Sequence, residues 1–142
     1  MNNCLALFVL IVLFTNCSGD RSNHSINNMD KVGAPKFVVQ QEIHNFGSLE
    51  SGEIVYFSFE YKNSGSGLLK IDSIDSGCGC LEVIWPKKVL KEGESDYIKV
   101  IFNSSGEWGN IYKPILIYTN TKKKKHEISI TANVNNQLFK NK

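Results

Sequence analysis

The pattern of apolar and polar residues divides the chain into three parts. An unbroken apolar run, Cys4 to Phe14 (CLALFVLIVLF), comes first and is preceded by no charged side chain. A polar stretch without any apolar period follows, from Ser18 to about Lys36. From Phe37 to Val134 apolar and polar side chains alternate with a period of two, and turn residues recur at short intervals. This third part predicts β-strands.

We predict seven short strands and no amphipathic helix in the third part. The clearest is Glu53 to Lys62, because its apolar side chains fall on one face and its polar ones on the other. Asn45 to Leu49 is interpreted as a turn after the first strand. Seven strands at this spacing predict an all-β fold, an immunoglobulin-like β-sandwich of antiparallel strands. The expected strands are 37–43, 53–62, 69–74, 81–85, 97–103, 111–118 and 127–134.

The apolar run is typical of the central region of a secretory signal peptide. It is well short of the ~20 residues that a spanning helix needs. Cys17 follows it within a few residues, and this arrangement resembles the bacterial lipobox, whose cysteine receives a diacylglyceryl group before cleavage. We therefore expect residues 1–16 to be a removed signal peptide and Cys17 to be lipidated, rather than free or disulfide-bonded.

The residue after Cys17 indicates in which membrane the lipidated chain would be anchored. Ser18, not aspartate, follows Cys17, and the resemblance then favours the outer membrane of a Gram-negative cell envelope. Residues 17–36 would form a flexible tether, 37–134 the folded domain, and 135–142 a frayed tail. About 125 residues remain after cleavage, enough for one domain with a core.

Charge argues against a nucleic-acid-binding protein, because the net charge is only +2. The one dense basic run is Lys122 to Lys125, which could contact lipid phosphates or another anionic surface. We favour the simpler interpretation, a solvated turn between two strands. Trp85 and Trp108 could form an exposed binding platform, but we expect both in the core.

Cys78 and Cys80 are the only cysteines besides Cys17 that cleavage would leave. In an oxidising envelope they could form a tight disulfide, serving as a local clamp or a redox couple. As thiolates they could hold a soft metal such as copper, although no third ligand is marked by spacing. They could also be two packed thiols in a turn. His44 and His126 are available as ligands or bases in principle, but nothing in the sequence places either near the cysteines.

Several segments together resemble a bacterial family known only as domain of unknown function 1573, many of whose members are lipoproteins. The resemblance covers about Phe37 to Val134 and implies an immunoglobulin-like domain without an established activity. Gly77 and Leu81 depart from the residues usual on either side of the cysteines. The matching segments are Phe46-Gly47-Ser48-Leu49, Phe59 to Gly65, Gly77-Cys78-Gly79-Cys80, Gly93 to Asn103, Gly109 to Lys113 and Thr119-Asn120.

No complete catalytic constellation is found, so we do not expect an enzyme or a cofactor. The sequence predicts a membrane-anchored, non-enzymatic module that binds another envelope protein or polymer, or that serves a structural purpose. The alternative is an envelope thiol protein, redox-active or copper-binding, that uses Cys78 and Cys80.

Overall fold

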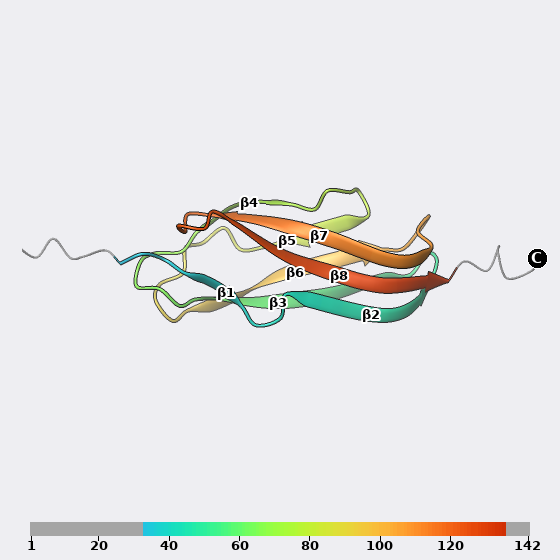
Figure 1. Cartoon of the computed structure of the whole chain (residues 1–142), viewed down its shortest axis with the longest axis horizontal. Coiled ribbons are helices and arrows are strands. Elements are labelled where there is room, and N and C mark those ends of the chain that lie inside the picture. The colour runs from blue at the N-terminus through green and yellow to red at the C-terminus, as the bar shows by residue number, and fades with distance from the viewer. Residues whose placement is uncertain (1–32, 136–142) are drawn as a thin grey trace, which may run out of the picture.

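The computed structural model describes residues 33–135, which form two packed four-stranded β-sheets (Figure 1). The first sheet has the order β1-β3-β6-β5, and the second has the order β2-β8-β7-β4. The predicted all-β sandwich is confirmed, with eight strands in place of seven. The strands are β1 (Phe37–Val39), β2 (Ile43–Glu50), β3 (Ile54–Asn63), β4 (Ile71–Asp75), β5 (Leu81–Ile84), β6 (Ser95–Asn103), β7 (Gly109–Thr119) and β8 (Lys125–Asn135).

The core lies between the two sheets and is built by the period-two pattern. In the central pair of the first sheet, Phe59 lies opposite Ile98, and both side chains are buried. The neighbouring pair, Phe57 and Val100, points to the same inner side. Ile115 pairs with Ile128 in the second sheet, and these two are fully buried as well. Burial of these apolar side chains is the main stabilising contribution to the fold.

The first predicted strand, 37–43, is wrong in one respect, because it is divided between the two sheets. β1 pairs with β3 in the first sheet, whereas β2 pairs with β8 in the second. The predicted turn at Asn45 to Leu49 lies inside β2 and is a β-bulge. Gly47 adopts a positive φ of 74°, and its N–H donates to Asn45 Oδ1 at 2.8 Å. A bulge inserts one extra residue and often uses a glycine with positive φ, as a turn does. The segment therefore resembles a turn in composition although it lies within a strand.

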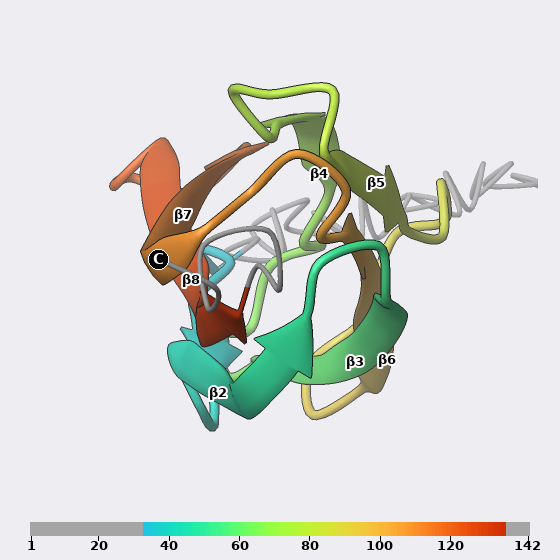
Figure 2. The same cartoon turned by 90° about the vertical axis from the view of Figure 1, so that its right-hand side faces the viewer.

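A second difference concerns strand direction. β2 runs parallel to β8, whereas every other pair is antiparallel. Each open side of the sandwich is bordered by a segment that leaves one sheet and joins the other. β1 and β2 border one side, and β4 and β5 border the other (Figure 2). The four edge strands are protected in two ways: β1 and β5 are short, whereas β2 and β4 each carry an irregularity in register.

The strands run lengthwise, so the loops gather at two opposite ends (Figure 1). We call the end at which the described chain begins the tether end; its segments are 33–36, 64–70, 85–94 and 120–124. The opposite end, here the distal end, has the loops 51–53, 76–80 and 104–108. Residues 120–124 connect β7 to β8, as predicted for the lysine run. Within residues 33–135 no helix is long and apolar enough to cross a membrane.

One buried side chain joins the loops of the tether end. Asn63 is fully buried at the end of β3, and its Oδ1 accepts hydrogen bonds from the N–H groups of Lys36 and Gly65 at 3.2 and 3.1 Å. Its Nδ2 donates to the carbonyl oxygens of Gly67 and Leu90 at 2.6 and 3.0 Å. Three chain segments are thus held by one amide, and all four of its hydrogen bonds stay satisfied.

Candidate functional site

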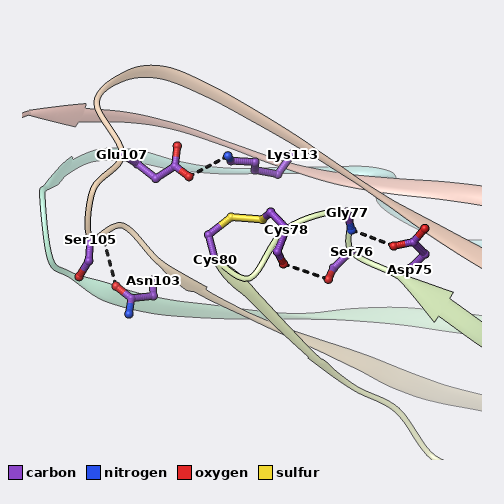
Figure 3. Close-up of a disulfide and its surroundings, with 9 residues drawn as sticks. All are labelled: Asp75, Ser76, Gly77, Cys78, Cys80, Asn103, Ser105, Glu107 and Lys113. Carbon is purple, nitrogen blue, oxygen red and sulfur yellow. Dashed lines mark hydrogen bonds and ion pairs between the residues drawn. A yellow bond between two sulfur atoms is a disulfide. The ribbon is translucent and has the colours of Figure 1, made fainter.

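The distal end carries the only disulfide of the described residues. Cys78 and Cys80 are joined across one residue in the loop between β4 and β5, with their Cα atoms 5.3 Å apart (Figure 3). Both side chains are half-buried and pack against the edge of the core. Extended backbone would separate these Cα atoms by about 6.5 Å, so the loop bends inward between them.

The residues before and after the disulfide explain this loop. The carboxylate of Asp75 accepts a hydrogen bond from the Gly77 N–H at 2.9 Å, which turns the chain directly after β4. Gly77 has a positive φ of 69°, a conformation that a side chain would disfavour. At the far end of the loop, the Cys80 carbonyl accepts a hydrogen bond from the Asn103 N–H at 3.0 Å. The disulfide is therefore attached to the end of β6 and not only to its own loop.

A second loop, 104–108, is fixed beside the disulfide by Ser104. Its hydroxyl group is fully buried and lies 3.0 and 2.9 Å from the carbonyl oxygens of Glu50 and Glu53. The same oxygen accepts a hydrogen bond from the Gly52 N–H at 3.1 Å. The β2–β3 turn and the 104–108 loop therefore form one hydrogen-bonded unit. Sequence reasoning did not single out Ser104, because a serine in a polar loop gives no sign of burial.

Trp108 ends this loop and is 70% exposed, so the prediction that it belongs to the core is wrong. It lies outside both sheets, immediately before β7 begins, where the strand alternation does not apply. Beside it, Glu107 and Lys113 form an ion pair of 2.8 Å above the disulfide loop (Figure 3). Trp85 is closer to expectation, because it is half-buried and packs against the core. An exposed tryptophan on a fixed loop is a typical anchor for a protein partner.

Neither histidine joins the cysteines. His44 stacks on Phe57, with ring centroids 3.7 Å apart, and burial lowers its pKa. His126 lies at the tether end, where its Nε2 is 3.0 Å from the Thr121 hydroxyl oxygen. Burial and the nearby Lys123 ammonium lower the pKa of His126. Both imidazoles therefore pack against neighbouring side chains away from the disulfide. No group of three potential metal ligands forms within residues 33–135.

A groove of about 760 Å³ lies on the side of the tether end, between β1 and the turn into β8. Phe37, Val38 and Val39 supply its apolar part. Lys122 and Lys123 line it together with acidic side chains, so its charge is mixed. The remaining lining residues are Pro35, Lys36, Glu42, Thr121, His126 and Glu127. The residues on which the predicted export and lipidation rest, 1–17, lie outside the described part of the chain.

Solved structures of similar shape support the fold. A protein of unknown function from Porphyromonas gingivalis W83 matches at 21% identity with a TM-score of 0.60, covering 71% of this chain and 46% of that protein. A PapD-like domain of human CEP192 matches at 12% identity with a TM-score of 0.60, covering 72% of this chain and 87% of that domain. The VesB protease of Vibrio cholerae matches at 15% identity with a TM-score of 0.54, covering 72% of this chain and 32% of that protein. At these identities the likeness shows the fold alone.

The present chain thus spans less than half of the Porphyromonas protein. No curated protein matches the sequence. One family matches residues 37–134, from the first residue of β1 to nearly the last of β8, and therefore the whole sandwich. The match includes the Asn63 amide, the disulfide loop and Ser104. The chain belongs to this family, which is described as "protein of unknown function (DUF1573)".

Proposed function

We propose that this protein is a membrane-anchored, non-enzymatic binding module that presents its distal end to another protein of the cell envelope. The lipid on Cys17 would hold the chain at the membrane. The sandwich would act as a rigid spacer, because its strands run from the tether end to the distal end (Figure 1). The disulfide loop and the 104–108 loop would form the contact surface.

The observation that carries this proposal is Trp108, which stands 70% exposed on a loop whose base is fixed by the buried Ser104. Exposing a large aromatic side chain on a rigid support forgoes the stabilisation of burying it in the core. Tryptophan is also one of the three residue types enriched among the side chains that dominate the energy of protein interfaces. The adjacent disulfide restricts the neighbouring loop, so little conformational entropy would be lost on binding.

Anchoring is supported by the order of the parts along the sequence. Residues 17–36 connect the predicted lipid to Phe37, the first residue of β1. Lys36 is held by Asn63, so the part to be treated as a flexible coil is about 16 residues long, with a root-mean-square reach of roughly 22 Å. A tether of this length would let the distal end reach a partner that lies away from the bilayer.

Site-specific photocrosslinking tests the contact surface in intact cells that make the full chain. A photoreactive amino acid at the exposed position Ser105 is expected to yield one discrete crosslinked species. That species should be lost when Trp108→Ala is added. Tyr97→Ala is the matched control, because Tyr97 is an exposed aromatic residue of β6, 53% exposed and closer to the tether end. Equal crosslinking in both alanine variants would contradict the proposal.

The alternative function, a thiol redox or copper-binding protein, depends on the cysteine pair that forms the disulfide of the distal end. Cys78 and Cys80 would have to be reduced before either could bind a metal or attack a substrate. Mass analysis of the purified protein after alkylation, with and without reductant, decides this case. A pair that cycles between both states in the cell, or copper bound at one ion per chain, would favour the alternative over the binding module.

A further inference from the structure

Charge is distributed unequally between the two ends of the sandwich. The four segments of the tether end carry eight lysines and two glutamates, a net charge of +6. The three loops of the distal end carry two glutamates and no lysine, a net charge of −2. This difference is hidden in the sequence, where the net charge of the whole chain is only +2. The eight lysines are Lys36, Lys70, Lys87, Lys88, Lys91, Lys122, Lys123 and Lys124.

All eight side chains are exposed, and few are neutralised by neighbours. Lys70 pairs with Asp72 at 3.1 Å, and Lys88 pairs with Asp96 at 2.8 Å. The other six have no ion-pair partner among residues 33–135. Glu42 and Glu127 line the neighbouring groove and reduce the local charge, but Lys62 and Lys125, in the strands next to these loops, offset them, so the end remains basic.

Exposed aliphatic side chains lie among these lysines. Leu69 and Leu90 are buried and paired through two backbone hydrogen bonds of 2.9 and 2.8 Å, which join the 64–70 and 85–94 loops. Because side chains alternate along extended backbone, the residues next to them point outward. Leu68 is 52% exposed and Val89 is 46% exposed, each beside an outward lysine of the paired segment.

We propose that the tether end is a second membrane contact, which binds the phosphate groups of anionic phospholipids and inserts Leu68 and Val89 among the lipids. The inference rests on the proposed anchor, because Lys36 belongs to this end and is the last residue of the predicted tether. Lysines near an anionic surface and aliphatic side chains at the interface are the two contributions that peripheral membrane contacts combine. Asn63 keeps the loops in a fixed relative position, so the lysines and aliphatic side chains face the bilayer together.

Vesicle sedimentation separates this contact from the lipid anchor. The mature chain, residues 17–142 with Cys17→Ser, is expected to bind vesicles that contain 30% phosphatidylglycerol at 50 mM salt. Binding should weaken at least tenfold at 300 mM salt, because the lysine contribution is screened, and should be undetectable on pure phosphatidylcholine. The lipidated chain should bind both kinds of vesicle at both salt concentrations.

Variants distinguish a specific contact from general basicity. Lys122→Gln with Lys123→Gln should lower the partition coefficient by roughly 25-fold, about fivefold for each lysine. Lys99→Gln with Lys113→Gln is the control of equal charge, since these lysines belong to β6 and β7 and lie outside the four segments of the tether end; it should change the coefficient less than twofold. Leu68→Ser with Val89→Ser should weaken binding severalfold at both salt concentrations.

The outcomes are separable. If the Cys17→Ser chain shows no preference for anionic vesicles, or if both lysine pairs have the same effect, the second contact is wrong. If wild-type protein purified from cells fails to bind phosphatidylcholine vesicles, the proposed anchor is wrong, whatever the lysine variants do.

Discussion

Asn63 and Ser104 are single buried polar side chains that each hold several loops together, one at each end of the sandwich. Asn63 makes four side-chain hydrogen bonds and Ser104 makes three, all of them to backbone groups of the neighbouring loops and strand ends. Losing such a side chain leaves several buried donors and acceptors without partners, which costs more than the average hydrogen bond is worth. The geometry of both ends therefore depends on two residues that lie in no contact surface.

Asn63→Ala should lower the free energy of unfolding by about 3 kcal/mol, because four hydrogen bonds are lost in a buried position. Urea denaturation followed by circular dichroism measures the change. Asn103→Ala is the matched control: this asparagine is exposed, its side-chain oxygen accepts a hydrogen bond from the Ser105 N–H, and the substitution should cost less than about 1 kcal/mol. Equal losses in the two variants would show that Asn63 does not join the loops.

The disulfide should contribute little to global stability, because it closes a loop with only one residue between the cysteines. The chain-entropy relation gives about 1.6 kcal/mol for such a loop, compared with ~4.7 kcal/mol for a loop of 100 residues. Cys78→Ser and reduction of the wild type should lower the free energy of unfolding by similar small amounts in denaturant titrations. A loss above ~4 kcal/mol would instead make the pair a central stabilising element.

His44 and His126 should make the fold less stable in mild acid. Their pKa values are lowered in the folded state, so the unfolded chain binds protons more readily between that lowered value and the ordinary pKa of about 6.5. Stability is then full above pH 6.5 and falls as the pH decreases below it. His44→Phe preserves the stack on Phe57 and should reduce this decline between pH 7.5 and 5.5, measured by thermal unfolding. An unchanged pH profile would contradict the assignment.

At the scale of elements, strict alternation was the reliable signal. The strand predicted at Glu53 to Lys62 is β3, Ile54–Asn63, with the expected inward face. The prediction of one strand over 37–43 was wrong, because alternation reveals which side chains are buried but not which sheet a strand joins. The bulge at Gly47 then resembles a turn in composition. Similarly, an exposed tryptophan and a buried asparagine cannot be recognised in isolation, since their burial depends on loops that are distant in sequence.

Close packing at the tether end can be tested with glycines. A Cβ added at Gly67 would lie 1.9 Å from the Gly33 carbonyl oxygen, so Gly67→Ala should force the loops apart and cost more than about 2 kcal/mol. Gly79, between the cysteines, has no atom within 4 Å of such a Cβ. Gly79→Ala should therefore be nearly neutral in denaturant titrations. The same cost at both positions would contradict the described packing of segments 33–36 and 64–67.

At the scale of the whole molecule, the two ends of the sandwich differ in charge and in exposed side chains. The tether end combines lysines with two aliphatic side chains, whereas the distal end combines a disulfide loop with Trp108. The predicted lysine turn was correct as local structure. Its neighbours Lys36, Lys70 and Lys91 come from distant parts of the sequence, so the basic end became visible only in the fold. A membrane on one side and a protein partner on the other would account for this asymmetry.

The lipid at Cys17 is central to the proposed function, and intact-mass spectrometry of protein purified from the membrane fraction tests it directly. We expect a chain that begins at Cys17 and carries the added mass of a diacylglyceryl group, with or without a third acyl chain. Cys17→Ala should leave the signal peptide uncleaved and the protein without lipid. A mature wild-type protein that starts at any other residue, or that carries no lipid at Cys17, would contradict the account.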